Sequence, residues 1–152
     1  MIKKALTFIG CLLPWFLTSI VPLDYKFYER ITLPFFAPPR LFYPIAWTIT
    51  YLLITITIYN IVISRKFKDI PNSYKITLLI NYLFNQSYTL SFFGLKSTFL
   101  GFVTCLGTLI SSLFLYEETK VLNNKISKLL IPYILLLVFA TILSLSIYIL
   151  NI

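Results

Sequence analysis

The amino-acid sequence predicts an all-α polytopic membrane protein in which five transmembrane helices form a single bundle. Two observations support this fold class. Five stretches of about 20 residues contain no Asp, Glu, Lys or Arg, and each is long enough to cross the roughly 30 Å hydrocarbon core of a bilayer as a helix. Over all 152 residues, 59% are hydrophobic and 12% are charged, whereas about 25% are charged in typical soluble domains.

The predicted spans follow one another along nearly the whole chain. They comprise residues 5–23, 41–64, 76–95, 97–116 and 129–152, and all 18 charged residues lie outside them. A charge at mid-membrane costs about 2.5 to 3.5 kcal/mol on insertion scales, so this separation supports the boundaries. We therefore expect one transmembrane domain, residues 1–152.

The distribution of Lys and Arg predicts the orientation in the membrane. With alternating loops, nine of the 13 basic residues fall on the side of the N-terminus and four on the other. Because cytoplasmic loops are enriched in Lys and Arg, we expect a multi-pass protein of the cell membrane with its N-terminus in the cytoplasm and its C-terminus outside. A cleaved signal peptide over the first span is the alternative, but the length of that span and Pro14 disfavour it.

Side chains that are missing from the spans exclude several functions. The chain contains no His, and its five acidic residues lie outside the spans. The commonest metal ligand and general base are therefore absent, and an intramembrane proton relay has no carboxylate to use. Cys11 and Cys105 match no metal or redox spacing. We predict no catalytic residue, no metal site and no cofactor, and no nucleic-acid partner, because the net charge of +8 is spread over loops on both sides of the membrane.

The third span contains most of the polar side chains of the membrane region. Asn81, Asn85, Tyr88 and Phe92 are spaced by four, three and four residues, so they lie on one face of a helix. Lipid offers an amide no hydrogen-bond partner, so the two amides must find partners in the protein or in a ligand. One interpretation is a hydrogen-bond clamp between helices, and the other is the wall of a pocket for a largely apolar ligand. The spacing alone favours neither.

The loop of residues 24–40 is the longest connection, and it contains five aromatic residues. Solvated linkers are rarely so aromatic, so we expect this loop either to fold over the end of the bundle as a lid or to lie in the membrane interface. The connection between the third and fourth spans is minimal. It predicts a tight antiparallel hairpin, with Gly94 suited to cap the third span.

Other spans present further candidate faces. Trp47 and Tyr51 lie four residues apart early in the second span and form either a pocket edge or part of an interfacial aromatic belt. The fifth span has a face that leaves room for a helix or a ligand, formed by Pro132, Leu136, Ala140 and Ser144. Small residues in the fourth span indicate a dimer seam or close packing within one bundle, and they are Gly101, Cys105, Gly107 and Ser111.

Four segments in order resemble the TspO/MBR family, and the chain resembles a bacterial member of it. Members are also called translocator proteins, peripheral-type benzodiazepine receptors or tryptophan-rich sensory proteins. The segments are PLDYKFYERITLPFFAPP at 22–39, FYPIAWTITY at 42–51, NYLFNQSYTLSFFG at 81–94 and LLIPYILLLVFATILSLSIYILN at 129–151. They resemble the family's Pro-x-Asp and Trp-x-Pro-Pro loop, its Pro-x-x-Trp-Thr-x-x-Tyr second helix, its Asn-x-x-Trp-Ser-x-x-Phe-Phe third helix and its Leu-Leu-Ile-Pro-Tyr fifth helix.

The resemblance implies a five-helix bundle, often a homodimer, whose cavity beneath the first loop binds tetrapyrroles such as protoporphyrin IX or haem-like molecules. Sterols and synthetic isoquinoline or benzodiazepine-type ligands bind some members, and membrane lipid surrounds the bundle. Matching positions put Trp47, Asn85 and Ala140 in the pocket. With the faces described above, the candidate ligand-binding residues are Trp47, Tyr51, Asn81, Asn85, Tyr88, Phe92, Leu136, Ala140 and Ser144. The candidate lid residues are Asp24, Phe36, Pro38 and Pro39.

The chain also departs from the family. Where the family commonly has Trp, this chain has Phe27, Phe36, Tyr88, Leu136 and Tyr148, and its two tryptophans are Trp15 and Trp47. Porphyrin photodegradation is linked in relatives to pocket tryptophans, so an enzymatic role is disfavoured. The main hypothesis is a membrane protein that binds tetrapyrroles and related apolar ligands in sensing, sequestration or transport. The alternatives are a light-dependent porphyrin-degrading enzyme and a small transporter or interaction subunit without a tetrapyrrole ligand.

Overall fold

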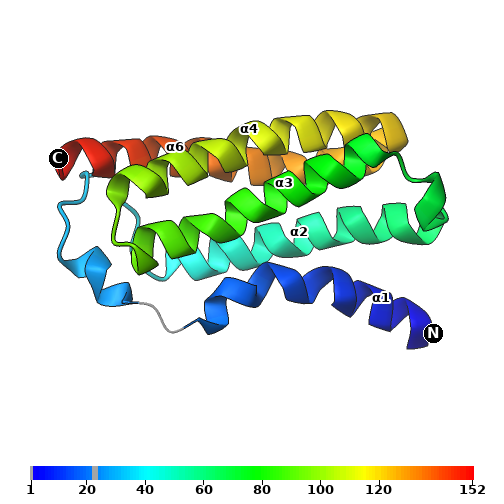
Figure 1. The fold of residues 1–152 in the computed structure, drawn as a ribbon, viewed down its shortest axis with the longest axis horizontal. Coiled ribbons are helices and arrows are strands. Elements are labelled where there is room, and N and C mark those ends of the chain that lie inside the picture. The colour runs from blue at the N-terminus through cyan, green and yellow to red at the C-terminus, as the bar shows by residue number, and fades with distance from the viewer. Residues whose placement is uncertain (1, 22–23) are drawn as a thin grey trace.

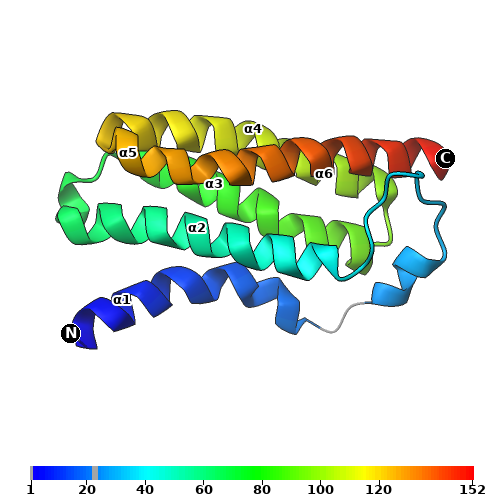
Figure 2. The ribbon, with the colours of Figure 1, turned by 180° about the vertical axis from the view of Figure 1, so that it is seen from behind.

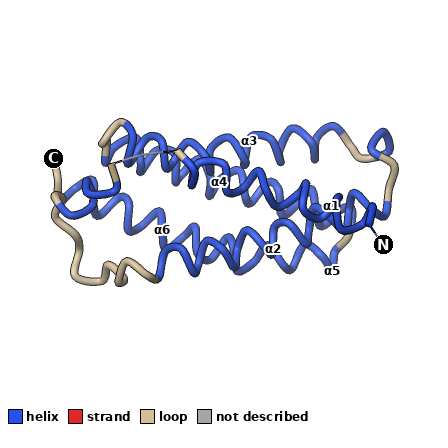
Figure 3. Tube along the Cα trace, turned by 90° about the horizontal axis from the view of Figure 1, so that it is seen from below, coloured by secondary structure: helices blue, strands red, loops and turns tan. Residues whose placement is uncertain are grey.

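The computed structural model describes residues 2–21 and 24–152, and most of these residues are helical, with no β-strand among them. Pro22 and Leu23, the last two residues of the first predicted span, lie outside the described residues. The two ends of the chain lie at opposite ends of the bundle (Figure 1), as an odd number of crossings requires. Loops gather at the two ends of the bundle (Figure 3), so the all-α fold is confirmed.

Within the described residues, five helical segments run along the bundle. Three are long and apolar enough to cross a membrane: α2 (Phe42–Ser64), α4 (Thr98–Leu122) and the segment Asn124–Leu150. This last segment comprises α5 (Asn124–Ser127), the 3-10 turn η5 (Lys128–Leu130) and α6 (Ile131–Leu150). The other two segments are α1 (Ile2–Leu12) with the 3-10 helix η1 (Leu13–Ile20), and α3 (Asn72–Thr89) with the π-helical turn η4 (Leu90–Gly94).

The first span changes helix type after Leu12. Pro14 has no backbone N–H and its ring crowds the preceding turn, so an α-helix cannot continue through it without losing a hydrogen bond. The chain continues as η1, with Pro14 near its start. Gln86 of α3 holds this segment, because its amide donates to the carbonyl oxygen of Trp15 (3.2 Å) and accepts from the backbone N–H of Thr18 (3.3 Å). A polar residue of the third span therefore positions η1 beside the bundle.

Several helical segments extend beyond the charge-free stretches, and α4 and α3 show how. α4 continues beyond Tyr116 through two glutamates and a lysine to Leu122, because long charged side chains at a helix end can reach water without ending the helix. α3 begins at Asn72, four residues before the predicted span. A charge-free stretch therefore measures the apolar part of a helix, and the helix itself can be longer.

The predicted tight hairpin between α3 and α4 is confirmed, but its turn residue differs. η4 ends at Gly94 and α4 begins at Thr98. The positive φ that such a turn needs is adopted by Lys96, at 53°, whereas Gly94 has no positive φ. Ser97 begins the next helix by accepting a hydrogen bond from the backbone N–H of Leu100 at 3.1 Å. The expectation that Gly94 caps the third span was therefore wrong.

The loop of residues 24–40 folds over the end of the bundle and passes beside the C-terminal end of α6 before it enters α2 (Figure 2). It contains a short 3-10 helix, η2 (Tyr25–Glu29). Its first residue, Asp24, forms an ion pair with Lys96 of the α3–α4 turn at 3.0 Å. Farther along, the backbone of Thr32 forms two hydrogen bonds with the side-chain amide of Asn151, at 2.8 and 2.9 Å. The start and the middle of the loop are thus attached to the bundle beneath them.

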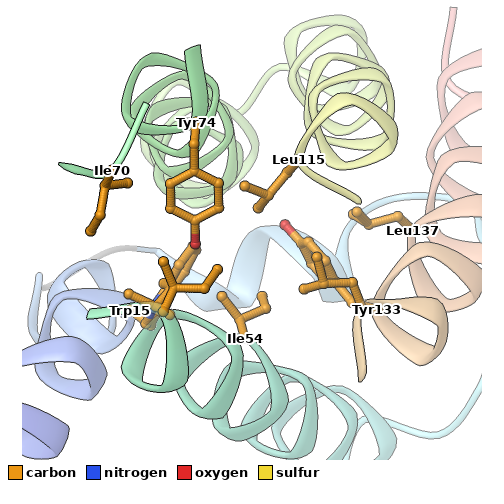
Figure 4. Close-up of a cluster of buried hydrophobic side chains, with 10 residues drawn as sticks. Trp15, Ile54, Ile70, Tyr74, Leu115, Tyr133 and Leu137 are labelled. Atoms are coloured by element: carbon orange, nitrogen blue, oxygen red, sulfur yellow. The ribbon is translucent and has the colours of Figure 1, made fainter. Parts of the chain in front are cut away.

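A buried apolar cluster lies at the centre of the bundle. Figure 4 shows side chains from different helical segments that pack together, namely Trp15, Ile54, Ile70, Tyr74, Leu115, Tyr133 and Leu137. Trp15 is 3% exposed although it lies in the first segment, so η1 is packed into the bundle. Leu137 belongs both to this cluster and to the wall of the cavity described below. The core therefore lies directly against the cavity.

Candidate functional site

A cavity of about 640 Å³ lies between the loop of residues 24–40 and the helices η1, α2, α3, α4 and α6. Pockets that bind small molecules typically measure about 300 to 1,000 Å³, so this cavity can hold a ligand of that class. The side chains that line its described part are mostly aromatic, aliphatic, hydroxyl and amide groups. Such a lining can enclose and orient an apolar molecule that carries a few polar atoms.

The structure brings most of the predicted ligand-binding residues together. All nine are described, and the six that line the cavity are Trp47, Tyr51, Asn85, Tyr88, Ala140 and Ser144. They come from α2, α3 and α6, which are separated in sequence and meet around this space. The other three, Asn81, Phe92 and Leu136, are not among the lining residues.

Asn81 links three helices instead of facing the cavity. Its side chain is 0% exposed. The amide nitrogen donates to the carbonyl oxygen of Thr108 (3.2 Å) and to the hydroxyl of Ser111 (3.1 Å), both in α4. The amide oxygen accepts from the hydroxyl of Tyr133 in α6 (3.2 Å). This geometry is the hydrogen-bond clamp between helices that the spacing had left open.

Asn85 has both roles, because it lines the cavity and also holds other side chains. Its amide oxygen accepts from the hydroxyl of Tyr51 (3.0 Å) and from the amide of Gln86 (3.3 Å), and its nitrogen donates to the hydroxyl of Tyr133 (3.3 Å). A side-chain amide has two N–H groups, and the described residues supply a partner for one of them. Because Asn85 also lines the cavity, its second N–H is the group on this side chain that could donate to a ligand.

Phe92 supports the cavity wall from behind. Its ring is 1% exposed and stacks on the ring of Tyr88, with centroids 5.6 Å apart and an angle of 10° between the planes. On its other side, it lies close to Gly101 of α4. Phe92 thus determines where the Tyr88 ring stands, while Tyr88 itself lines the cavity.

The lining face of α6 shares Ala140 and Ser144 with the predicted face but differs from it in the preceding turn. Leu136 is half-buried but does not line the cavity, whereas the neighbouring Leu137 does, together with Ala140, Leu143 and Ser144. A four-residue spacing drifts around a helix because one turn contains 3.6 residues. A face that stays in register over two turns therefore combines steps of three and four residues.

The aromatic edge predicted for α2 forms one wall of the cavity. The rings of Trp47 and Tyr51 have centroids 5.7 Å apart, and Tyr51 also stacks on the buried Trp15 of η1 at 5.7 Å. The hydrogen bond from Tyr51 to Asn85 fixes the orientation of its ring. Aromatic rings that are already packed in this way provide a preformed surface for a flat ligand.

The four predicted lid residues do not line the cavity, although they attach or shape the loop. The ion pair and hydrogen bond with Lys96 lower the pKa of Asp24 below its ordinary value of 3.8. Phe36 lies against Phe139 of α6, with centroids 6.4 Å apart. Pro38 is half-buried, and the carbonyl oxygen of Pro39 accepts from the first N–H of α2 at 2.9 Å.

Other residues of the same loop reach the cavity, and the sequence analysis did not identify them. They are Lys26, Tyr28, Glu29 and Arg40. Arg40 forms an ion pair with Glu29 at 2.6 Å, and the hydroxyl of Tyr28 lies 2.7 Å from that of Tyr43 in α2. Lys26 and Glu29 are three residues apart, a spacing that places them on one side of a 3-10 helix. The sequence alone could not use this spacing, because it gave no sign that residues 25–29 form a 3-10 helix.

Comparison with known proteins gives a consistent result. The sequence profile of the TspO/MBR family matches residues 5–150. The chain is 33% identical over 138 residues to the tryptophan-rich protein TspO of Bacillus cereus, covering 90% of this chain and 89% of that protein. It is 31% identical over 132 residues to the uncharacterized membrane protein YtaB of Bacillus subtilis, covering 87% and 84%. It is 30% identical over 128 residues to the tryptophan-rich protein TspO of Archaeoglobus fulgidus, covering 82% and 79%. With this match over nearly its whole length and the five-segment helical bundle, the chain is a membrane protein that belongs to the TspO/MBR family.

Proposed function

We propose that this protein binds flat, largely apolar molecules of the tetrapyrrole class within the membrane, in sensing, sequestration or transport. The observation that supports this proposal best is the cavity of about 640 Å³ beneath the 24–40 loop. One wall consists of packed aromatic rings, and the free N–H of Asn85 offers a polar contact. A rigid macrocycle would gain contact area with the rings of Trp47 and Tyr51, and it would place a ring nitrogen or a substituent near the amide.

We further propose that the protein lies in the cell membrane with its N-terminus in the cytoplasm and its C-terminus outside. The excess of Lys and Arg on the N-terminal side supports this orientation. Binding of sterols or of synthetic isoquinoline and benzodiazepine-type ligands, and formation of a homodimer, stay as predictions from the family resemblance.

The binding proposal is tested by titrating the purified protein with protoporphyrin IX in the dark, in a non-ionic detergent. The shift of the porphyrin absorbance band reports binding, so the same readout serves for tryptophan variants. Asn85→Leu removes the polar contact to the ligand and also the hydrogen bond that orients Tyr51, so binding should weaken by at least about 1 kcal/mol, or roughly fivefold. Trp47→Ala removes part of the aromatic wall and should weaken binding at least as much.

Asn60→Leu is the matched control, because Asn60 lies on the same helix as Trp47 and donates to its own helix, to the carbonyl oxygen of Ile56 at 2.7 Å. It should bind protoporphyrin IX like the wild type. Affinity no greater than that of an unrelated five-span protein would overturn the proposal, as would unchanged binding by both cavity variants. Repeating the titration under light separates binding from degradation, because degradation requires a loss of porphyrin absorbance that exceeds the rate without protein.

A further inference from the structure

The mouth of the cavity carries a small group of charges above an otherwise uncharged lining. Among the described lining residues, three are charged: Lys26 and Glu29 in η2, and Arg40 just before α2. Arg40 is already paired with Glu29 at 2.6 Å. Lys26 forms no ion pair with any residue that the structure describes. Among the described lining residues, the mouth therefore has a net charge of +1, and one of its two cations forms no ion pair.

The three charged side chains are exposed at the mouth, and the cavity below them has an uncharged lining. Arg40 and Glu29 have side chains that are 66% and 48% exposed, and Lys26 is exposed as well. The lining below consists of aromatic, aliphatic and neutral polar groups. A ligand whose apolar body fills the cavity would therefore present its outer edge to Lys26 and Arg40. An acidic group at that edge would be attracted by Lys26 and would stay in contact with water.

Two tyrosine hydroxyls also lie at the mouth of the cavity and can donate hydrogen bonds. The hydroxyls of Tyr28 and Tyr43 lie 2.7 Å apart and both residues line the cavity. One hydroxyl donates to the other, so the accepting tyrosine retains an O–H that can donate to a ligand. Arg40 uses Nη1 for Glu29, and the guanidinium has four further N–H groups. The mouth thus offers a cation and several hydrogen-bond donors to an oxyanion.

We propose that the cavity prefers ligands that carry a carboxylate at one edge, and that Lys26, beside Arg40 and the tyrosine pair, forms the subsite for this carboxylate. This inference rests on the proposed function and narrows it from flat apolar molecules to flat apolar acids. Glu29 opposes the preference, because it neutralises Arg40 and repels an anion. The structure therefore assigns opposite effects to the removal of Lys26 and the removal of Glu29.

Protoporphyrin IX and its dimethyl ester are suitable probes, because they share the macrocycle and differ in their two carboxylates. Exposed ion pairs contribute about 0.2 to 1 kcal/mol, or up to about fivefold in affinity. Lys26→Gln should weaken binding of the acid by about two- to fivefold and leave the ester unchanged. Glu29→Gln should strengthen binding of the acid by a similar factor. Raising the NaCl concentration should weaken binding of the acid selectively, because salt screens exposed charges.

Lys66→Gln is the matched control, since Lys66 lies in the connection after α2, away from the cavity lining. It should bind both probes like the wild type. Equal affinities of wild type for acid and ester would overturn the carboxylate subsite while leaving the proposed function intact, as would a Lys26→Gln effect of equal size on both probes. If neither probe binds, the proposed function fails and the subsite fails with it. A gain in affinity in Glu29→Gln is informative because damage to the fold cannot produce it.

Discussion

Replacing Asn81 with leucine is expected to destabilise the bundle and to leave the affinity for a cavity ligand unchanged. Leucine has the same branch at the γ carbon, so the substitution removes the amide with little change in shape. In the wild type, this amide forms three hydrogen bonds to α4 and α6, at 3.1, 3.2 and 3.2 Å. Because Asn81 is 0% exposed, neither water nor a ligand in the cavity can replace these bonds.

The size of the effect follows from these three bonds. Hydrogen bonds between transmembrane helices contribute about 0.6 kcal/mol each on average, so losing three lowers the free energy of unfolding by about 2 kcal/mol. For a chain of this length, that corresponds to a decrease in Tm of about 4 to 8 °C. The hydroxyl of Tyr133 still accepts a hydrogen bond from Asn85, but its O–H loses the acceptor that Asn81 provided, so about 2 kcal/mol is the lower end of the expected loss.

The assay follows tryptophan fluorescence during heating in one non-ionic detergent, together with a porphyrin titration of the same samples. Asn60→Leu is again the control, because its amide donates within its own helix, and its Tm should change by less than about 2 °C. A decrease in Tm for Asn81→Leu no larger than that of the control would refute the clamp. A loss of affinity without a loss of stability would instead place Asn81 in the ligand site.

Two further predictions concern packing and the lid. Gly101→Ala should lower the free energy of unfolding by about 1 to 3 kcal/mol in a thermal or denaturant assay, because a Cβ there would lie 2.6 Å from the buried ring of Phe92. Gly107→Ala should cost less, because the ring of Phe84 that its Cβ would meet at 2.5 Å is 37% exposed and can turn away. The pKa of Asp24 is lowered in the folded protein, chiefly by the hydrogen bond from the lysine of the α3–α4 turn. Its stabilising effect is therefore present above pH 3.8 and is lost as the pH falls through the folded-state pKa, so the wild type and Asp24→Asn should differ in Tm near neutral pH and converge in acid.

A different result would contradict the glycine predictions and the Asp24 prediction. Equal losses of stability in the two glycine variants would show that the buried ring is as free to move as the exposed one. A Tm difference between the wild type and Asp24→Asn that persists unchanged in acid would show that the ion pair of the lid does not explain the effect of the substitution.

The sequence predicted the position of every helical segment, and it predicted the ends of the second span most closely. The second span, predicted as 41–64, is the helix Phe42–Ser64, because Arg40 and Arg65 stand on either side of it. The prediction was less accurate for α4, which continues through charged residues that can reach water from a helix end. In the first span, Pro14 indicated a disturbance, but the 3-10 helix that follows depends on Gln86 of another helix.

For the candidate site, the sequence indicated which residues face the protein interior, and the packing of the helices decided what each of them contacts. The spacing of Asn81 and Asn85 correctly indicated that both lie on the face of α3 that turns toward protein. Which of them binds a neighbouring helix and which faces the cavity depends on where α4 and α6 approach α3. Likewise, the sequence indicated an inward face on α6, but packing decided that Leu137 lines the cavity and Leu136 does not.

The sequence by itself determined that this chain is a helical membrane protein, where its apolar segments lie and which polar residues they contain. The physical reason is local, because the cost of placing a charge or an unpaired amide in lipid belongs to each residue wherever it stands in the fold. Only the tertiary structure decided the roles of those residues, since a role depends on the partner across the helix interface. The clamp at Asn81, the hydrogen bond from Asn85 to Tyr133 and the place of Lys26 at the cavity mouth all depend on how segments that are distant in sequence pack together.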